Sequence, residues 1–134
     1  ISHLALAAIT RNPVNIFVPL DTLRDYIYVD DAALQAIHWI EKTQQQQEAS
    51  VKVIASGQPQ TLGRIVSLMN NISRIRIQIA FGFDASAEHQ TRDLRMTPDS
   101  DNHTHRLPVT PLPVGMKMVL ADISCRHTST ASMI

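Results

Sequence analysis

RDYIYVDDAALQAI, residues 24–37, predicts a short strand that continues directly into a helix. Over residues 24–30 tyrosines alternate with β-branched residues, which is the pattern of a strand with two different faces. The adjacent acids Asp30 and Asp31 predict an N-cap carboxylate for a helix that ends near Lys42. The expected apolar stripe of that helix comprises Ala33, Ala36, Ile37 and Ile40.

Composition limits the classes of protein to which the chain can belong. It has 134 residues, of which 44% are hydrophobic and 18% charged, and its formal net charge is zero. This is enough for one globular domain with a core, and the balanced charge argues against broad binding to nucleic acid or to anionic membranes. No apolar run is long enough to span a membrane. The single cysteine, Cys125, excludes an internal disulfide and favours a cytoplasmic location.

The remaining elements alternate between helices and strands, as expected of an α/β chain. Before residue 24 the sequence predicts a helix over Ser2–Arg11, stopped by Asn12-Pro13, and a strand over Val14–Val18. After the second helix it predicts a buried strand at Val51–Ile54, a turn, and a helix capped by Thr61. The stripe of that third helix is the clearest in the chain and comprises Leu62, Ile65, Val66, Met69 and Ile72.

The last third of the chain is less regular. Alternation over Ser73–Ala80 predicts an edge strand, and residues 82–107 predict a long loop. A final helix starts at Thr110-Pro111, carries apolar residues to Ile123, and gives way to a polar, frayed tail over residues 124–134. The chain starts at Ile1 in what looks like the middle of a helix, which is typical of a fragment of a longer protein.

Few residues suggest chemistry by type and spacing alone. Arg24 can clamp a phosphate, held ready by its acidic neighbour, or can form an ordinary salt bridge, and the residues leave both interpretations open. Gln58 follows a predicted parallel strand, where open α/β sheets bind ligands, although a plain turn explains it as well. His103 and His105 lack the further ligands that a metal site needs. There is no phosphate-binding glycine loop and no nucleophile motif, so the sequence predicts no catalytic or metal-binding residues here.

RDYIYVDDAA closely resembles a segment of the extended short-chain dehydrogenases/reductases, the NAD-dependent nucleotide-sugar epimerases and dehydratases. The resemblance continues in order through VNIFVPLDTL before it and VIASGQPQTLGRIVSLM after it, then through Leu94-Arg95-Met96 and TPLPVGMKMVLADI. It implies the carboxyl-terminal, substrate-binding portion of a Rossmann-type α/β enzyme, built from short strands and about four helices. Residues 1–123 would form this portion, with a strand-helix unit at 51–72 that completes the Rossmann sheet, and 124–134 the tail.

The resemblance also implies roles for single residues. Arg24 would bind the substrate diphosphate, with Tyr26 and Gln58 also facing the substrate. Phe83-Asp84-Ala85-Ser86 stands where the family has a second diphosphate-binding arginine, so Arg92, or failing that Arg95, would replace it. NAD or NADP would be bound by the parent protein and not by this segment alone, because the cofactor loop and the Tyr-x-x-x-Lys pair belong to the missing amino-terminal half. The parent would act as a homodimer.

Two other functions stay open at this level. The first is a reductase or dehydratase of the same family whose substrate is not a nucleotide sugar. The second is a non-catalytic binding module. Either would keep the predicted fold and change what Arg24 binds.

Overall fold

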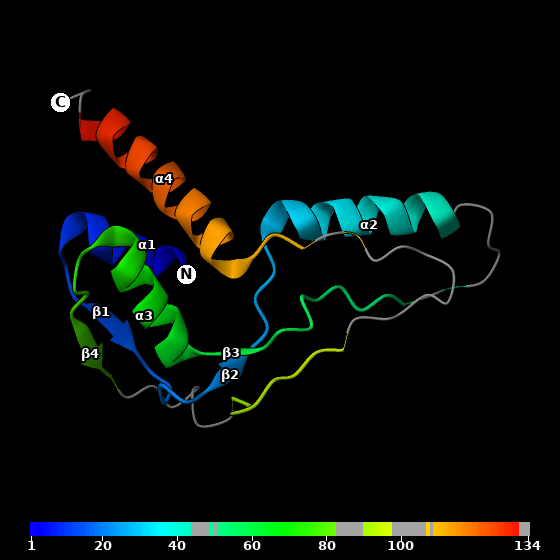
Figure 1. Cartoon of the computed structure of the whole chain (residues 1–134), viewed down its shortest axis with the longest axis horizontal. Coiled ribbons are helices and arrows are strands. Elements are labelled where there is room, and N and C mark those ends of the chain that lie inside the picture. The colour runs from blue at the N-terminus through cyan, green and yellow to red at the C-terminus, as the bar shows by residue number, and fades with distance from the viewer. Residues whose placement is uncertain (44–48, 50, 83–89, 98–106, 108, 132–134) are drawn as a thin grey trace.

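The computed structural model describes residues 1–43, 49, 51–82, 90–97, 107 and 109–131. Their elements, in chain order, are α1 (Ser2–Thr10), β1 (Val14–Ile16), β2 (Leu23–Arg24), α2 (Val29–Thr43), β3 (Gln60–Thr61), α3 (Leu62–Ser73), β4 (Ile79–Phe81) and α4 (Leu112–Ala131) (Figure 1). The predicted mixture of four helices and short strands is confirmed.

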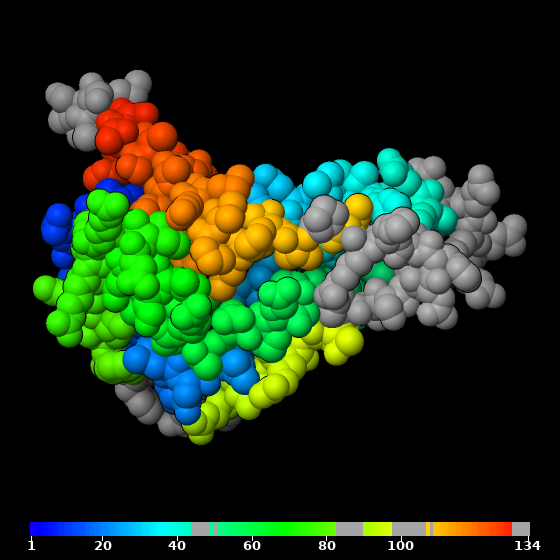
Figure 2. All heavy atoms as spheres, viewed as in Figure 1, coloured from blue at the N-terminus to red at the C-terminus, as the bar shows by residue number. Residues whose placement is uncertain are grey.

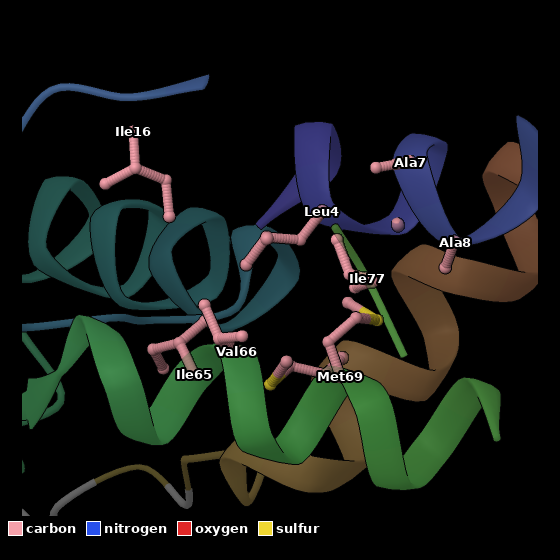
Figure 3. Packing of buried hydrophobic residues seen from close by; sticks show 10 residues of the cluster. Leu4, Ala7, Ala8, Ile16, Ile65, Val66, Met69 and Ile77 are labelled. Carbon is pink, nitrogen blue, oxygen red and sulfur yellow. The ribbon is translucent and has the colours of Figure 1, made fainter. Parts of the chain in front are cut away.

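The core lies between three helices and one pair of strands. β1 and β4 pair in parallel, with Val14 opposite Ile79, and α1, α3 and α4 pack on one another beside them. Buried side chains of α1 and α3 meet Ile16 and Ile77 in one cluster (Figure 3). Ala5 and Ala8 of α1 are almost fully buried. Because their side chains are small, the neighbouring helices can approach α1 closely.

The sequence pattern of α3 predicts its burial correctly. Ile65 and Met69 are fully buried and Val66 is nearly so, at the positions of the expected stripe. Thr61 is the N-cap, since its hydroxyl accepts a hydrogen bond of 3.2 Å from the amide of Arg64. A satisfied cap and a stripe that is buried at its middle three positions place α3 at the centre of the core.

The strand predicted over residues 24–30 is wrong. β2 contains only Leu23 and Arg24, and α2 already starts at Val29, so Asp30 and Asp31 lie in its first turn. A strand exists only where a neighbour supplies hydrogen bonds, and β3 is also two residues long. Negative charge in the first turn still suits the positive end of the helix.

Two further strands differ from expectation for the same reason. Val51–Ile54 forms no strand in this structure, because none of the described strands pairs with it. The strand predicted over Ser73–Ala80 is confined to Ile79–Phe81, which is the part that lies beside β1. The predicted role of residues 51–72 in a larger Rossmann sheet stays a prediction.

The last helix is longer than predicted. α4 continues through residue 131, whereas the apolar pattern predicts its end at Ile123. Met116 is buried against the core, while residues 125–129 are exposed. The polar segment is therefore helical through Ala131 without packing.

α2 extends away from the body formed by the other helices (Figures 1 and 2). The stripe predicted to face a core is not buried: Ile37 and Ile40 are each more than half exposed, and the only buried residue of the helix is Asp31. The face is therefore covered only in part.

Candidate functional site

Arg24 lies on the middle segment of a small three-stranded patch. On one side β2 pairs antiparallel with β3, with Arg24 opposite Gln60. On the other side Leu23 exchanges backbone hydrogen bonds with Arg92 (3.1 Å) and Leu94 (3.2 Å). The predicted long loop thus returns to β2 and brings Arg92 beside Arg24.

The guanidinium of Arg24 is held by carbonyl groups and not by an acid. Its Nη1 donates to the carbonyl oxygens of Leu23 (2.7 Å) and Arg92 (3.1 Å). Within the described part of the chain no carboxylate pairs with it. One of the two interpretations of Arg24 was an ordinary salt bridge, and none is seen among these residues. The positive charge of Arg24 therefore lacks a counter-ion from the described part of the chain. Two carbonyls fix the orientation of the group, leaving Nη2 and Nε available for an anion.

Asp25 does not hold Arg24, contrary to expectation. Its two carboxylate oxygens accept hydrogen bonds from the backbone amides of Ser56 and Gly57, each 2.8 Å long. Gly57 has a φ of 70°, a conformation that glycine adopts without strain. Asp25 therefore fixes the turn that precedes Gln58.

The turn leads through Gln58 to Gln60, which lies opposite Arg24. The backbone amide of Gln58 donates to the hydroxyl of Ser56 at 3.0 Å, and Nε2 of the Gln60 side chain donates to the backbone carbonyl of Gln58 at 3.5 Å. Directly opposite residues of an antiparallel pair project to the same face, so Gln60 shares a face with Arg24. Gln60 was missed in the sequence because only strand register identifies it.

Arg92 lies next to Arg24 through its backbone, but its charge is paired. Its guanidinium forms an ion pair with the carboxylate of Asp21, and both side chains are more than half exposed. Exposed ion pairs of this kind contribute little free energy. Arg92 can therefore leave Asp21 at small cost for a stronger anion.

Tyr26 faces the core more than the site. Its ring is half-buried and packs against the apolar cluster. Burial raises the pKa of its phenol, and the nearby charge of Arg24 opposes this shift only in part. The phenol is neutral at physiological pH and can donate a hydrogen bond.

Asp31 lies in the first turn of α2, and its carboxylate binds the segment that precedes α4. Its oxygens accept hydrogen bonds from the backbone amide of Thr110 (2.6 Å) and from the Thr110 hydroxyl (2.9 Å), immediately before α4. The carboxylate thus ties the start of α2 to the start of α4. Asp31 thereby holds the start of α2, the helix that follows Arg24 in the chain, in place.

Other candidate features are absent or fall outside the described residues. The described part of the chain contains no cluster of three or more histidine, cysteine or acidic side chains able to hold a metal. The segments with His103 and His105 and with Phe83–Ser86 lie outside it. None of the helices described has the length and apolar composition needed to cross a bilayer.

Solved structures share this fold. A protein described as an epimerase from Burkholderia cenocepacia J2315 superposes with a TM-score of 0.75 at 18% identity, over 91% of this chain and 39% of its own. MoeE5 in complex with UDP-glucose and NAD gives 0.71 at 20% identity, over 92% and 40%. UDP-glucose 4-epimerase from Thermotoga maritima, solved with UDP-glucose, gives 0.67 at 15%, over 92% and 38%.

The chain has the fold of the carboxyl-terminal portion of Rossmann-type epimerases and dehydratases. It spans about two-fifths of the length of these structures. The fold implied by the RDYIYVDDAA resemblance is therefore confirmed. No protein-family model and no curated protein matches the sequence.

Proposed function

We propose that this chain is the substrate-binding portion of an NAD(P)-dependent enzyme that epimerises or dehydrates a nucleotide sugar. The observation that carries the proposal is the guanidinium of Arg24, oriented by two carbonyls and lacking a carboxylate partner among the described residues. Such a group favours a diphosphate, which offers paired oxygens to a planar donor. UDP-glucose is the ligand in two structures of similar fold, which supports the choice of substrate class.

In this proposal the chain binds and orients the substrate. Arg24 neutralises the diphosphate, and Arg92 adds a second charge once it leaves Asp21. Gln58 and Gln60 supply amide groups at the same edge of the patch. Fixing the diphosphate fixes the attached sugar, and orientation of this kind lowers the barrier of a reaction carried out elsewhere in the protein.

The dinucleotide would be held by another part of the protein. The chain has four glycines, and none forms the closely spaced glycine turn that lets a pyrophosphate approach the backbone. When bound, the nicotinamide would accept and return a hydride. The residues of this chain supply no proton donor or acceptor to that step in our proposal.

Arg24→Ala is expected to weaken binding of UDP-glucose to the chain about tenfold or more, because it removes a charge-assisted hydrogen bond and a counter-charge. Isothermal titration calorimetry of the wild type, Arg24→Ala and Arg64→Ala would measure this. Arg64 is an exposed arginine of α3 outside the patch and serves as the matched control. Equal affinity in all three proteins, or no binding to the wild type, contradicts the proposal.

A second candidate is an enzyme of the same fold whose substrate has no diphosphate. The pairing of Arg92 with Asp21 favours it, because only Arg24 then presents an uncompensated charge at the patch. The same titration separates the two when UMP is compared with UDP. An affinity for UMP equal to that for UDP favours the second candidate.

We also propose that the exposed face of α2 is covered by the amino-terminal, dinucleotide-binding half. Leu34, Ile37 and Ile40 are 58%, 53% and 57% exposed, and Val51 nearby in the chain is 89% exposed. Full burial of an exposed side chain of this kind contributes about 1.5–3 kcal/mol, and about half of that is still to be gained at each of the three, so a face of this kind favours a partner. The solved structures of similar fold contain a further three-fifths of chain, which is a partner of sufficient size.

Without that partner, the 134-residue chain is expected to self-associate through α2. Leu34→Glu/Ile37→Glu should shift it to the monomer, as measured by sedimentation velocity over a concentration series. Gln35→Glu/Lys42→Gln changes the net charge equally on the same helix and should leave association intact. A wild-type chain that is monomeric at all concentrations, or association unaffected by the apolar substitutions, contradicts this role of α2.

A further inference from the structure

A small cavity lies where α1 and α3 end. Both helices finish with an arginine in the left-handed conformation, Arg11 with φ 58° and Arg74 with φ 56°. The chain after α3 then passes the end of α1 on its way to β4 and encloses a cavity of about 110 Å³. None of its lining residues belongs to the patch around Arg24.

The polar part of the lining consists of hydrogen-bond donors and amides. Arg11 and Arg76, together with Asn12 and Gln78, are exposed residues that line the cavity, and no carboxylate lines it among the residues described. Among the residues described, neither guanidinium forms an ion pair. Two cationic residues therefore border one cavity without a counter-ion from those residues.

The ends of the helices do not neutralise this charge. Each helix carboxyl terminus carries about half a negative charge, so two of them offset about one of the two cations. Arg74 at the end of α3 adds a third positive charge nearby. The balance at the cavity is positive.

The backbone that follows Arg76 is fixed at two successive residues. The amide of Ile77 donates to Oδ1 of Asn70 at 2.9 Å, and the carbonyl of Gln78 accepts from the amide of Val14 at 2.9 Å. Ile77 and Ala7, which also line the cavity, are buried in the core, so part of its lining is apolar. An anion would meet donors whose backbones are already in place.

Size decides which anions fit. Sites for cofactors and drug-sized ligands have volumes of about 300–1,000 Å³, well above the volume here. A nucleotide is therefore too large for the cavity, whereas a single tetrahedral oxyanion with several acceptor oxygens suits two guanidiniums and two amides.

We propose that the cavity between the ends of α1 and α3 binds phosphate through Arg11 and Arg76. The site is separate from the diphosphate site proposed at Arg24 and does not depend on it. Arginines can also stabilise helix ends without any ligand. That alternative predicts destabilised variants but no saturable response to phosphate, so the two are distinguishable.

The test is a titration of the full 134-residue chain with inorganic phosphate at constant ionic strength, followed by the amide NMR shifts of Asn12 and Ile77. The wild type should saturate, and Arg11→Gln/Arg76→Gln should bind at least about tenfold more weakly. Arg64→Gln/Lys117→Gln removes the same charge from exposed positions on α3 and α4 and should bind like the wild type. If the double variant is unfolded, Arg76→Gln alone replaces it, because this side chain is exposed.

Three outcomes would overturn the proposal. They are a wild-type response that does not saturate, a response that is equal in the cavity and control variants, and shifts spread over the surface instead of clustered at the cavity. Acetate in place of phosphate should bind more weakly, since it is planar and carries one charge. Equal affinity for acetate would also contradict a site for a tetrahedral anion.

Discussion

Replacing Asp25 with alanine is expected to destabilise the folded chain by about 3 kcal/mol. The carboxylate accepts two short hydrogen bonds, from the amides of Ser56 and Gly57, and Ser56 is 95% buried in the fold. Bonds to a charged group contribute about 1.5–3 kcal/mol each, and their loss leaves two amides without a partner. Alanine supplies no acceptor, so the turn before Gln58 should open.

Urea unfolding and amide hydrogen exchange measure this effect. Exchange at Ser56 and Gly57 should accelerate in Asp25→Ala, while exchange in the core of α3 should change only with global stability. Asp25→Asn should lose about half as much stability as Asp25→Ala, because the single carboxamide oxygen can accept well from only one of the two amides. Asp30→Ala is the control: Asp30 is exposed in the first turn of α2, and its removal should cost less than about 1 kcal/mol.

A loss in Asp25→Ala no greater than that in Asp30→Ala would contradict the role assigned to Asp25. Accelerated exchange spread evenly over the chain would contradict a local effect on the turn. Loss of UDP-glucose binding in Asp25→Asn, with the global fold retained, would connect the turn to the site at Arg24.

The helices were predictable where their burial is decided by their own pattern. The stripe of α3 is buried as expected, and Met116 of α4 lies in the core. Hydrophobic spacing of this kind is local information that a single sequence contains. α2 also has an apolar stripe, yet Ile37 and Ile40 are exposed, because burial also requires a neighbouring surface.

The strands were harder to predict, because a strand also requires a neighbouring segment. Alternation over residues 24–30 predicts which side chains share a face, but only a paired neighbour makes the segment a strand. The neighbour of β2 is β3, and it pairs over two residues. Val51–Ile54 has the apolar character of a covered strand and no strand paired with it among those described.

Some residues of the site can be identified from a local motif, and others only from contacts between distant segments. Arg24 was chosen from its motif, and its role as a substrate-binding residue stays a prediction; the structure places it beside the backbone of Arg92. Gln60 and the partners of Asp25 and Asp31 depend on contacts between segments about 30 to 80 residues apart. The local rules predict a cap at Asp30 and Asp31, whereas Asp31 binds Thr110, a residue of a distant segment.

Asp31→Ala is expected to cost about 3 kcal/mol and to separate the start of α2 from the start of α4. Asp31 is 8% exposed, and its carboxylate accepts from both the amide and the hydroxyl of Thr110. The same charge lies at the positive ends of two helices, which adds to its stabilising effect. Its removal leaves polar groups of Thr110 without an acceptor at the buried junction.

Asparagine separates the charge of Asp31 from its hydrogen bonds. In Asp31→Asn the carboxamide oxygen can still accept from the amide of Thr110, and the hydroxyl can rotate to accept from the new amide group, so the loss should fall to about 1 kcal/mol. Thr110→Val removes only the hydroxyl bond and should also cost about 1 kcal/mol. In Asp31→Ala/Thr110→Val the two losses should not add, because both substitutions break the same contact. Additive losses in urea unfolding of this cycle would show that Asp31 stabilises the fold without its contact to Thr110, and would overturn the assignment of Asp31 as the link between the two helices.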